Sequence, residues 1–264
     1  MAMALVAMKV LLAPLLVALA TLVARRYGPA LGGWFSALPV IAGPVLLVFV
    51  VEHGADFAQR AARGTLMGLV ALSAFIVAYA HVARHGSVLS SLAAGWLAFL
   101  AATVLIAGWD PSAALTSAFA GAALWLAWLL TRRTSPTGSV TGAVEASILV
   151  RVLLTAALVL ALTASSESLG PRLGGILAAF PVLASLLAAF THASHGGAAA
   201  GDLLHGMVAG LMGFATFCLV IAIALEPLGT VGAFGLAALA TLAVHATTLP
   251  FVTRGPAVPA VRAV

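Results

Sequence analysis

The chain has 264 residues, of which 63% are hydrophobic and only 7% charged, and its mean hydropathy is +1.19. Soluble domains are about half apolar and about a quarter charged, so this composition excludes a water-soluble globule and predicts an all-α membrane protein. The formal charge of +5 comes mostly from Lys and Arg between apolar runs, where they orient membrane helices, and it does not indicate nucleic-acid binding.

The apolar residues fall into runs of about 20, the length that a membrane-spanning helix needs. Lys9 lies inside the first run rather than ahead of it, which favours a membrane helix over a cleaved signal peptide. The runs are Ala4–Ala24, Pro29–Val51, Gly64–Val82, Val88–Ala107, Ser112–Leu130, Ile148–Ala164, Leu173–Thr191, Gly206–Leu225 and Val231–Leu249. They predict about nine transmembrane helices, and the polar stretch Thr131–Glu145 between the fifth and sixth is typical of a linker.

The chain matches itself when it is shifted by 142 positions, the distance from Gly28 to Gly170. The match needs no gap, and it aligns glycines, prolines and histidines, which apolar composition alone would not do. The matched pairs include Gly28-Pro29 with Gly170-Pro171, Gly32-Gly33 with Gly174-Gly175, Pro39 with Pro181, His53-Gly54 with His195-Gly196, Gly64 with Gly206, Gly68 with Gly210, and Lys9 with Arg151. We predict two tandem homologous units in one membrane domain: residues 1–142, with the linker at their end, and residues 143–264.

Five helices in the first unit and four in the second would invert the second unit in the bilayer, an arrangement common in secondary transporters. The charges agree with this count. On one side they place Arg25, Arg26, Arg84, Arg132, Arg133, Arg254 and Arg262. Positively charged loops stay in the cytoplasm, so we expect a multi-pass protein of the plasma (inner) membrane with its N-terminus outside and its C-terminus inside. If Ser112–Leu130 is re-entrant instead of spanning, the units would be parallel.

Two repeat-related helices carry glycines and prolines that would kink or break them, and in transporters such breaks mark the substrate site. The candidate substrate-binding residues are Gly28, Pro29, Gly32, Gly33, Pro39, Pro44, Gly170, Pro171, Gly174, Gly175 and Pro181. Because Pro44 has no counterpart in the second unit, the first of these helices is the one we expect to be discontinuous. The competing interpretation is packing alone, since glycines four residues apart let membrane helices approach closely.

Four polar residues are candidate contacts of the site. His53 and His195 follow the broken helices at equivalent positions, although a His-Gly pair is also what a helix C-cap looks like, and we favour the cap. Lys9 and Arg151 lie within apolar runs, where charges are costly unless they reach the interface. His192, His195, Asp202 and His205 fit no strong metal signature and are expected on a loop, so we predict no metal and no cofactor.

No phosphate-binding loop, zinc-protease motif or nucleophile elbow occurs, so the sequence does not indicate an enzyme. The leading hypothesis is a small secondary transporter or exporter of a small, weakly polar or anionic solute, with its site between the two broken helices. Two alternatives remain: a non-transporting membrane scaffold or subunit, and a membrane enzyme acting on a lipid-linked substrate. The expected partners are the lipid bilayer and a small molecule, and the sequence is compatible with a homo-oligomer.

Overall fold

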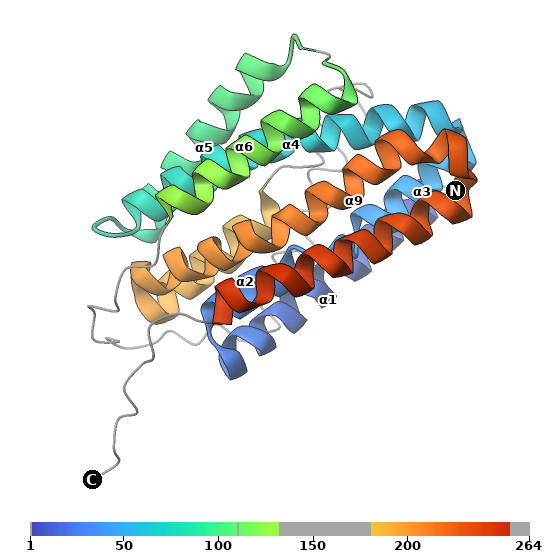
Figure 1. Cartoon of the computed structure of the whole chain (residues 1–264). Coiled ribbons are helices and arrows are strands. Elements are labelled where there is room, and N and C mark those ends of the chain that lie inside the picture. Colours follow the sequence, from blue (N-terminus) through green and yellow to red (C-terminus); the bar gives the residue numbers. More distant parts are fainter. Residues whose placement is uncertain (1, 110, 132–180, 254–264) are drawn as a thin grey trace.

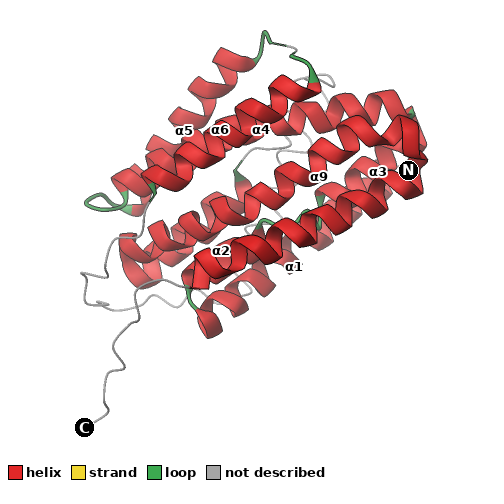
Figure 2. Ribbon diagram, in the orientation of Figure 1, coloured by secondary structure: helices red, strands yellow, loops and turns green. Residues whose placement is uncertain are grey.

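The computed structural model describes residues 2–109, 111–131 and 181–253, with only the helical backbone for residues 2–13. Every regular element within these ranges is a helix (Figure 2). In chain order the helices are α1 (Ala2–Tyr27), α2 (Pro29–Ser36), α3 (Ala42–His53), α4 (Ala55–Val82), α5 (Val88–Ile106), α6 (Ala113–Leu130) and α9 (Val182–Thr253). In Figure 1, α5 and α6 lie on one side of the bundle, α1 and α2 lie on the other, and α9 runs between them.

Helix α9 is divided by two glycines into three straight segments. Gly196 (φ 85°, ψ 169°) and Gly229 (φ 64°, ψ 176°) have positive φ, which side-chain-bearing residues rarely adopt. The first segment covers residues 182–195, the second 197–228 and the third 230–253. At 1.5 Å per residue the last two are about 48 Å and 36 Å long, so each exceeds the roughly 30 Å of a bilayer core.

Gly54 joins α3 to α4 with the same backbone geometry that Gly196 gives to α9. Its dihedral angles are φ 83° and ψ 171°, within 2° of those of Gly196. The Gly54 N–H donates to the carbonyl of Val50 at 3.0 Å, so His53-Gly54 ends α3 as a C-cap. The cap interpretation of this pair is confirmed.

The predicted interruption of the run Pro29–Val51 is confirmed. Helix α2 ends at Ser36, a turn around Pro39 follows, and α3 begins at Ala42. Pro39 has no N–H to donate, and its own carbonyl accepts from Gly43 N–H at 2.9 Å as the next helix starts. With 8 and 12 residues, α2 and α3 are each too short to cross a bilayer.

The glycines of α2 and of the second α9 segment bring the two helices into backbone contact. A Cβ at Gly33 would overlap the backbone of Leu203 and Met207, a Cβ at Gly206 that of Ala30, and a Cβ at Gly210 that of Trp34. This is the close approach that glycines four residues apart permit between membrane helices. On α4, the buried Phe75 ring packs against α5 at Gly95, and the buried Tyr79 lies against His192 of α9.

Four helices in the described ranges, α4, α5, α6 and α9, are long and apolar enough to span a membrane. The outer faces of α5, α6 and α9 carry large exposed apolar side chains, which suggests a membrane-embedded protein. The expected helices near the N-terminus, in Gly64–Leu130 and in Gly206–Leu249 are all present, and Ser112–Leu130 is helical over 18 residues. Ile148–Ala164 lies outside the described residues, so the count of nine stays a prediction.

Candidate functional site

A cavity of about 310 Å³ lies where α1, the start of α2 and the first segment of α9 meet. Its volume is at the lower end of the range typical of small-molecule sites. We call it the Gly28 cavity; its lining residues are Thr21, Ala24, Arg25, Gly28, Pro29, Leu187, Thr191, Ser194, His195 and Leu203.

One wall comes from the last two turns of α1. Thr21, Ala24, Arg25 and Gly28 recur at intervals of three and four residues, so they share one helix face. Gly28 then turns the chain with φ 97°, and Pro29 occupies the first position of α2, where a missing N–H costs nothing. The Gly28 kink between α1 and α2 therefore lies directly on the cavity, whereas the break at Pro39 does not line it.

The opposite wall is the first segment of α9. Leu187, Thr191 and Ser194 lie on one face of this segment and line the cavity together with His195. Another face of this segment makes hydrogen-bonding contacts with α5 and α4. The Trp96 indole N–H donates to Ser185 Oγ at 2.9 Å, and Tyr79 Oη lies 3.4 Å from His192 Nδ1.

The polar groups of the Gly28 cavity suit a small polar or anionic ligand. Thr21 is 3% exposed, and its hydroxyl has no hydrogen-bond partner in the structure. A buried hydroxyl without a partner costs about 1–3 kcal/mol, which a ligand would recover if a small shift of α1 brought it within reach of Thr21 Oγ1. The positive end of the α2 dipole and the Arg25 guanidinium both favour negative charge in this region.

The structure brings three of the candidate residues to this cavity: Gly28, Pro29 and His195. Gly32 and Gly33 are buried in helix contacts, Gly32 against Ala24 and Gly33 against Leu203. Pro39 lies in the turn between α2 and α3, Pro44 in the first turn of α3, and Pro181 immediately before α9.

His53 does not reach the Gly28 cavity. Its ring stacks on Phe57 with the centroids 4.6 Å apart, and its Nδ1 lies 3.9 Å from a carboxylate oxygen of Glu52. Lys9 lies in the part of α1 of which only the backbone is described. Gly170, Pro171, Gly174, Gly175 and Arg151 lie outside the described residues.

The expectation that His192, His195, Asp202 and His205 share a surface loop is wrong. All four lie on α9, because residues 197–228 continue as a helix directly after the Gly196 kink. His205 is buried: its ring stacks on Trp128 at 3.8 Å, and Nδ1 lies 3.2 Å from Thr131 Oγ1. The described ranges contain no group of three His, Cys, Asp or Glu residues able to hold a metal ion.

Sequence reasoning missed four polar residues of the Gly28 cavity: Thr21, Arg25, Thr191 and Ser194. A signal was present in the sequence. Thr21 and Arg25 are four residues apart, and Thr191 and Ser194 are three apart, so each pair lies on one face of an otherwise apolar helix. The 142-residue self-match directed attention to paired glycines, prolines and histidines. Arg25, Thr191 and Ser194 have no identical counterpart at that shift, and the match of Thr21 with Thr163 was overlooked.

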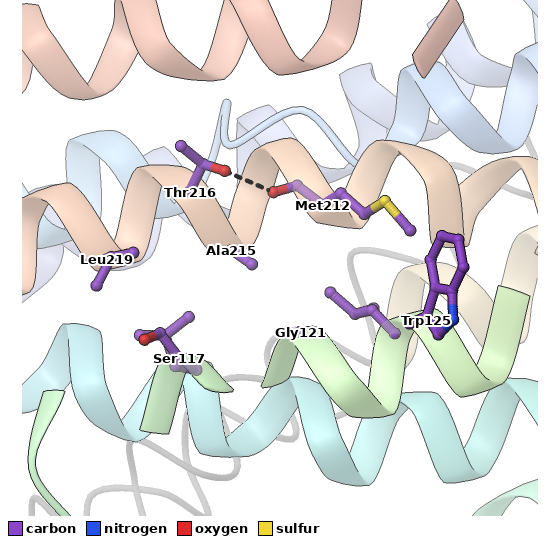
Figure 3. Close-up of a pocket in the computed structure, with 9 residues that line it drawn as sticks. Ser117, Gly121, Trp125, Met212, Ala215, Thr216 and Leu219 are labelled. Carbon is purple, nitrogen blue, oxygen red and sulfur yellow. Dashed lines mark hydrogen bonds between the residues drawn. The ribbon is translucent and has the colours of Figure 1, made fainter. Parts of the chain in front are cut away.

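A second cavity, of about 260 Å³, opens between α4, α6 and the second segment of α9. Figure 3 shows Trp125 and Gly121 of α6 facing Met212 and Ala215 of α9 across it. Its two hydroxyls already bond to carbonyls of their own helices, Ser117 to Ala114 and Thr216 to Met212. Both hydroxyls of this cavity are thus engaged and the rest of its lining is largely apolar, which suits an alkyl chain better than a polar solute.

Comparisons of the chain with family models, with curated proteins and with solved structures find no match.

Proposed function

We propose that this chain is a small secondary transporter or exporter that binds a small, polar or anionic solute in the Gly28 cavity. The observation that carries the proposal is the placement of this cavity at the Gly28 kink between α1 and α2, with an unpartnered buried hydroxyl and an arginine in its wall. Irregular backbone in a membrane protein is tolerated where it lines a wet cavity, and transporters place their sites at such broken helices.

We further propose that the two halves of the chain, residues 1–142 and 143–264, are tandem copies of inverted topology, with five and four helices. The 142-residue self-match and the common geometry of Gly54 and Gly196 support this. The arginine distribution supports an N-terminus outside the plasma (inner) membrane and a C-terminus in the cytoplasm.

The test is whether water reaches the Gly28 cavity. In a Cys218→Ala background we would place single cysteines at Thr21 and Thr191, where cysteine is close in volume to threonine, and probe them from each side with membrane-impermeant thiol reagents. Leu239, which is 69% exposed on the outer face of α9, is the lipid-facing control. We expect labelling at both cavity positions and none at Leu239→Cys. Protection of both cavity positions from both sides would contradict the proposal.

The ligand class has its own test. Acetate, phosphate and sulfate serve as probes, and the readout is the apparent melting temperature of the purified protein. We expect at least one anion to stabilise the native protein and to lose that effect in Thr21→Val, which keeps the shape of the side chain. Removing an unpartnered hydroxyl should leave the basal stability equal or higher. Equal stabilisation of both proteins by every anion would exclude Thr21 as a ligand contact.

The second cavity supports a different function, that of a membrane subunit whose groove between α6 and α9 holds a lipid chain or a partner helix. Gly121 is the position to test, because a Cβ there would meet nothing within 4 Å. Gly121→Leu should fill the groove and reduce co-purifying lipid or partner, while thiol labelling at Thr191→Cys stays unchanged. Unaltered co-purification would remove the support for this alternative.

A further inference from the structure

His245 is a buried histidine in the third segment of α9, at the contact between this segment, the second segment and α2. Its side chain is 3% exposed. The Trp34 ring of α2 lies against it, with the centroids 4.9 Å apart, and Gly213 of the second segment leaves the space that the imidazole fills. Ionisable residues inside membrane helices are costly and are functional candidates for that reason.

The hydrogen bonds of His245 define its neutral form. Nδ1 lies 3.2 Å from the carbonyl oxygen of Thr241, so Nδ1 carries the hydrogen and donates it. Nε2 then holds a lone pair, and it is buried with no hydrogen-bond partner. The imidazole is thus a proton acceptor with a vacant acceptor atom.

No polar atom of the described residues lies within hydrogen-bonding reach of His245 Nε2, so a second N–H there would find no acceptor. Trp34 Nε1–H donates to Thr248 Oγ1 at 3.1 Å, and Thr248 Oγ1 in turn donates to the carbonyl of His245. Thr241 Oγ1 donates to the carbonyl of Ala237 at 2.7 Å and lies 3.4 Å from the carbonyl oxygen of Gly213. The nearby hydroxyls therefore direct their hydrogens to carbonyls and leave Nε2 without a donor.

No opposite charge lies close by on the packed helices. Helix α2 contains no titratable residue. The titratable residues of the second α9 segment are Asp202, His205, Cys218 and Glu226, of which both carboxylates are eleven or more residues from Gly213. In the third segment, from residue 230 to 253, His245 itself is the one titratable side chain.

We propose that His245 is a proton-binding site whose protonation opens the contact between α2 and the third segment of α9. A proton on Nε2 would create a buried cation with an unsatisfied donor, so the protonated ring needs water or a new acceptor. That requires α2 or the third segment to move. Since α2 begins at Gly28 and Pro29, the same movement changes the Gly28 cavity.

The coupling to transport rests on the proposed function, but proton binding does not, and the first experiment needs no substrate. Protonated imidazole quenches the fluorescence of a neighbouring indole, and movement of α2 would also change the surroundings of Trp34. We would record tryptophan emission from pH 8.5 to 5 for the full chain in lipid nanodiscs. Four proteins form a cycle: wild type, His245→Gln, Trp34→Phe and the double variant.

With five tryptophans in the chain, we expect a pH-dependent change of up to about one fifth of the emission. This component should be missing in His245→Gln, missing in Trp34→Phe, and not reduced further in the double variant. The cycle also removes any signal from Trp128, which stacks on His205. A pH response as large as that of the wild type in either single variant overturns the proposal. If His245→Gln fails to fold, the comparison of wild type with Trp34→Phe decides alone.

A second measurement tests the link to the cavity. The labelling rate of Thr191→Cys is measured at pH 5.5 and pH 8, with and without His245→Gln. We expect a severalfold change with pH that disappears in the His245 variant. An emission change without any change in labelling would overturn the coupling between His245 and the cavity. Failure of labelling at both pH values, together with a normal emission titration, would sink the transport proposal while leaving the proton site intact.

Discussion

Replacing Gly206 with alanine should destabilise the fold, although alanine is normally the better helix former. A methyl group at this position would lie 2.6 Å from the carbonyl carbon of Ala30 and 2.8 Å from its Cα. Carbon atoms in contact need about 3.5–4.0 Å, so α2 and the second segment of α9 must separate by about 1 Å. The atoms in the way belong to the backbone, and no side chain can rotate aside.

The expected cost follows from two opposing terms. Overpacking of this kind costs about 1–3 kcal/mol, and the higher helix propensity of alanine returns about 1 kcal/mol. The net loss should therefore be up to about 2 kcal/mol, and Gly206→Ala should be about 1–3 kcal/mol less stable than a glycine-to-alanine change made in open space. Reversible unfolding in mixed detergent micelles, followed by circular dichroism, measures it directly.

Gly201→Ala is the matched control, because Gly201 lies on the same helical segment and a Cβ there would meet nothing within 4 Å. It should raise stability by about 1 kcal/mol or leave it unchanged. Gly64, the position that the 142-residue shift aligns with Gly206, is a second control with open space around it. If Gly206→Ala were as stable as Gly201→Ala, the backbone contact between α2 and α9 would be refuted.

Two further predictions concern the backbone and the interhelical hydrogen bonds. Gly54→Ala and Gly196→Ala should each lower the free energy of unfolding by about 1–3 kcal/mol in the same assay, because both positions need a positive φ that alanine rarely adopts. If both variants were as stable as Gly64→Ala, these kinks would be contradicted. Trp96→Phe and Ser185→Ala form a double-mutant cycle for the hydrogen bond between α5 and α9. Its coupling free energy should be about 0.6 kcal/mol and at most about 1.7 kcal/mol, as for other hydrogen bonds between membrane helices. A coupling of zero would mean that this bond does not contribute to stability.

The sequence predicted the helices well because apolar run length and glycine or proline punctuation act locally. The break at Pro39 and the cap at Gly54 were readable, since each depends on the residue itself. Run length also located α4, α5 and α6 to within a few residues, apart from the N-terminal extension of α4 to Ala55. That extension carries Asp56 and Arg60, an ion pair one helical turn apart that continues the helix beyond the apolar run.

The site was harder to predict because it depends on which helices meet. Gly28 and Gly33 look alike in the sequence, yet Gly28 lines a cavity and Gly33 is pressed against Leu203. His53 and His195 are aligned by the 142-residue shift, yet only His195 reaches the cavity. Thr21 gains its significance from being buried without a partner, a property of three-dimensional packing that no local pattern encodes.

The packing also bears on which parts of the proposed transporter would move. Helix α2 belongs to the first half of the sequence, but Gly33 and Trp34 attach it to the second and third segments of α9. The first segment of α9 belongs to the second half, but Trp96 and Tyr79 attach it to α5 and α4. Helix α2 and the first segment of α9 therefore each contact helices from the other half of the sequence. A rocking motion that kept residues 1–142 rigid against 143–264 would break both sets of contacts. A different division keeps them: α2 moves with the second and third segments of α9, and the first segment of α9 moves with α4 and α5. The Gly28 cavity lies between these two moving groups, with α1 and α2 on one side and the first segment of α9 on the other. Alternating access requires a site between the parts that move, and this position fulfils that requirement.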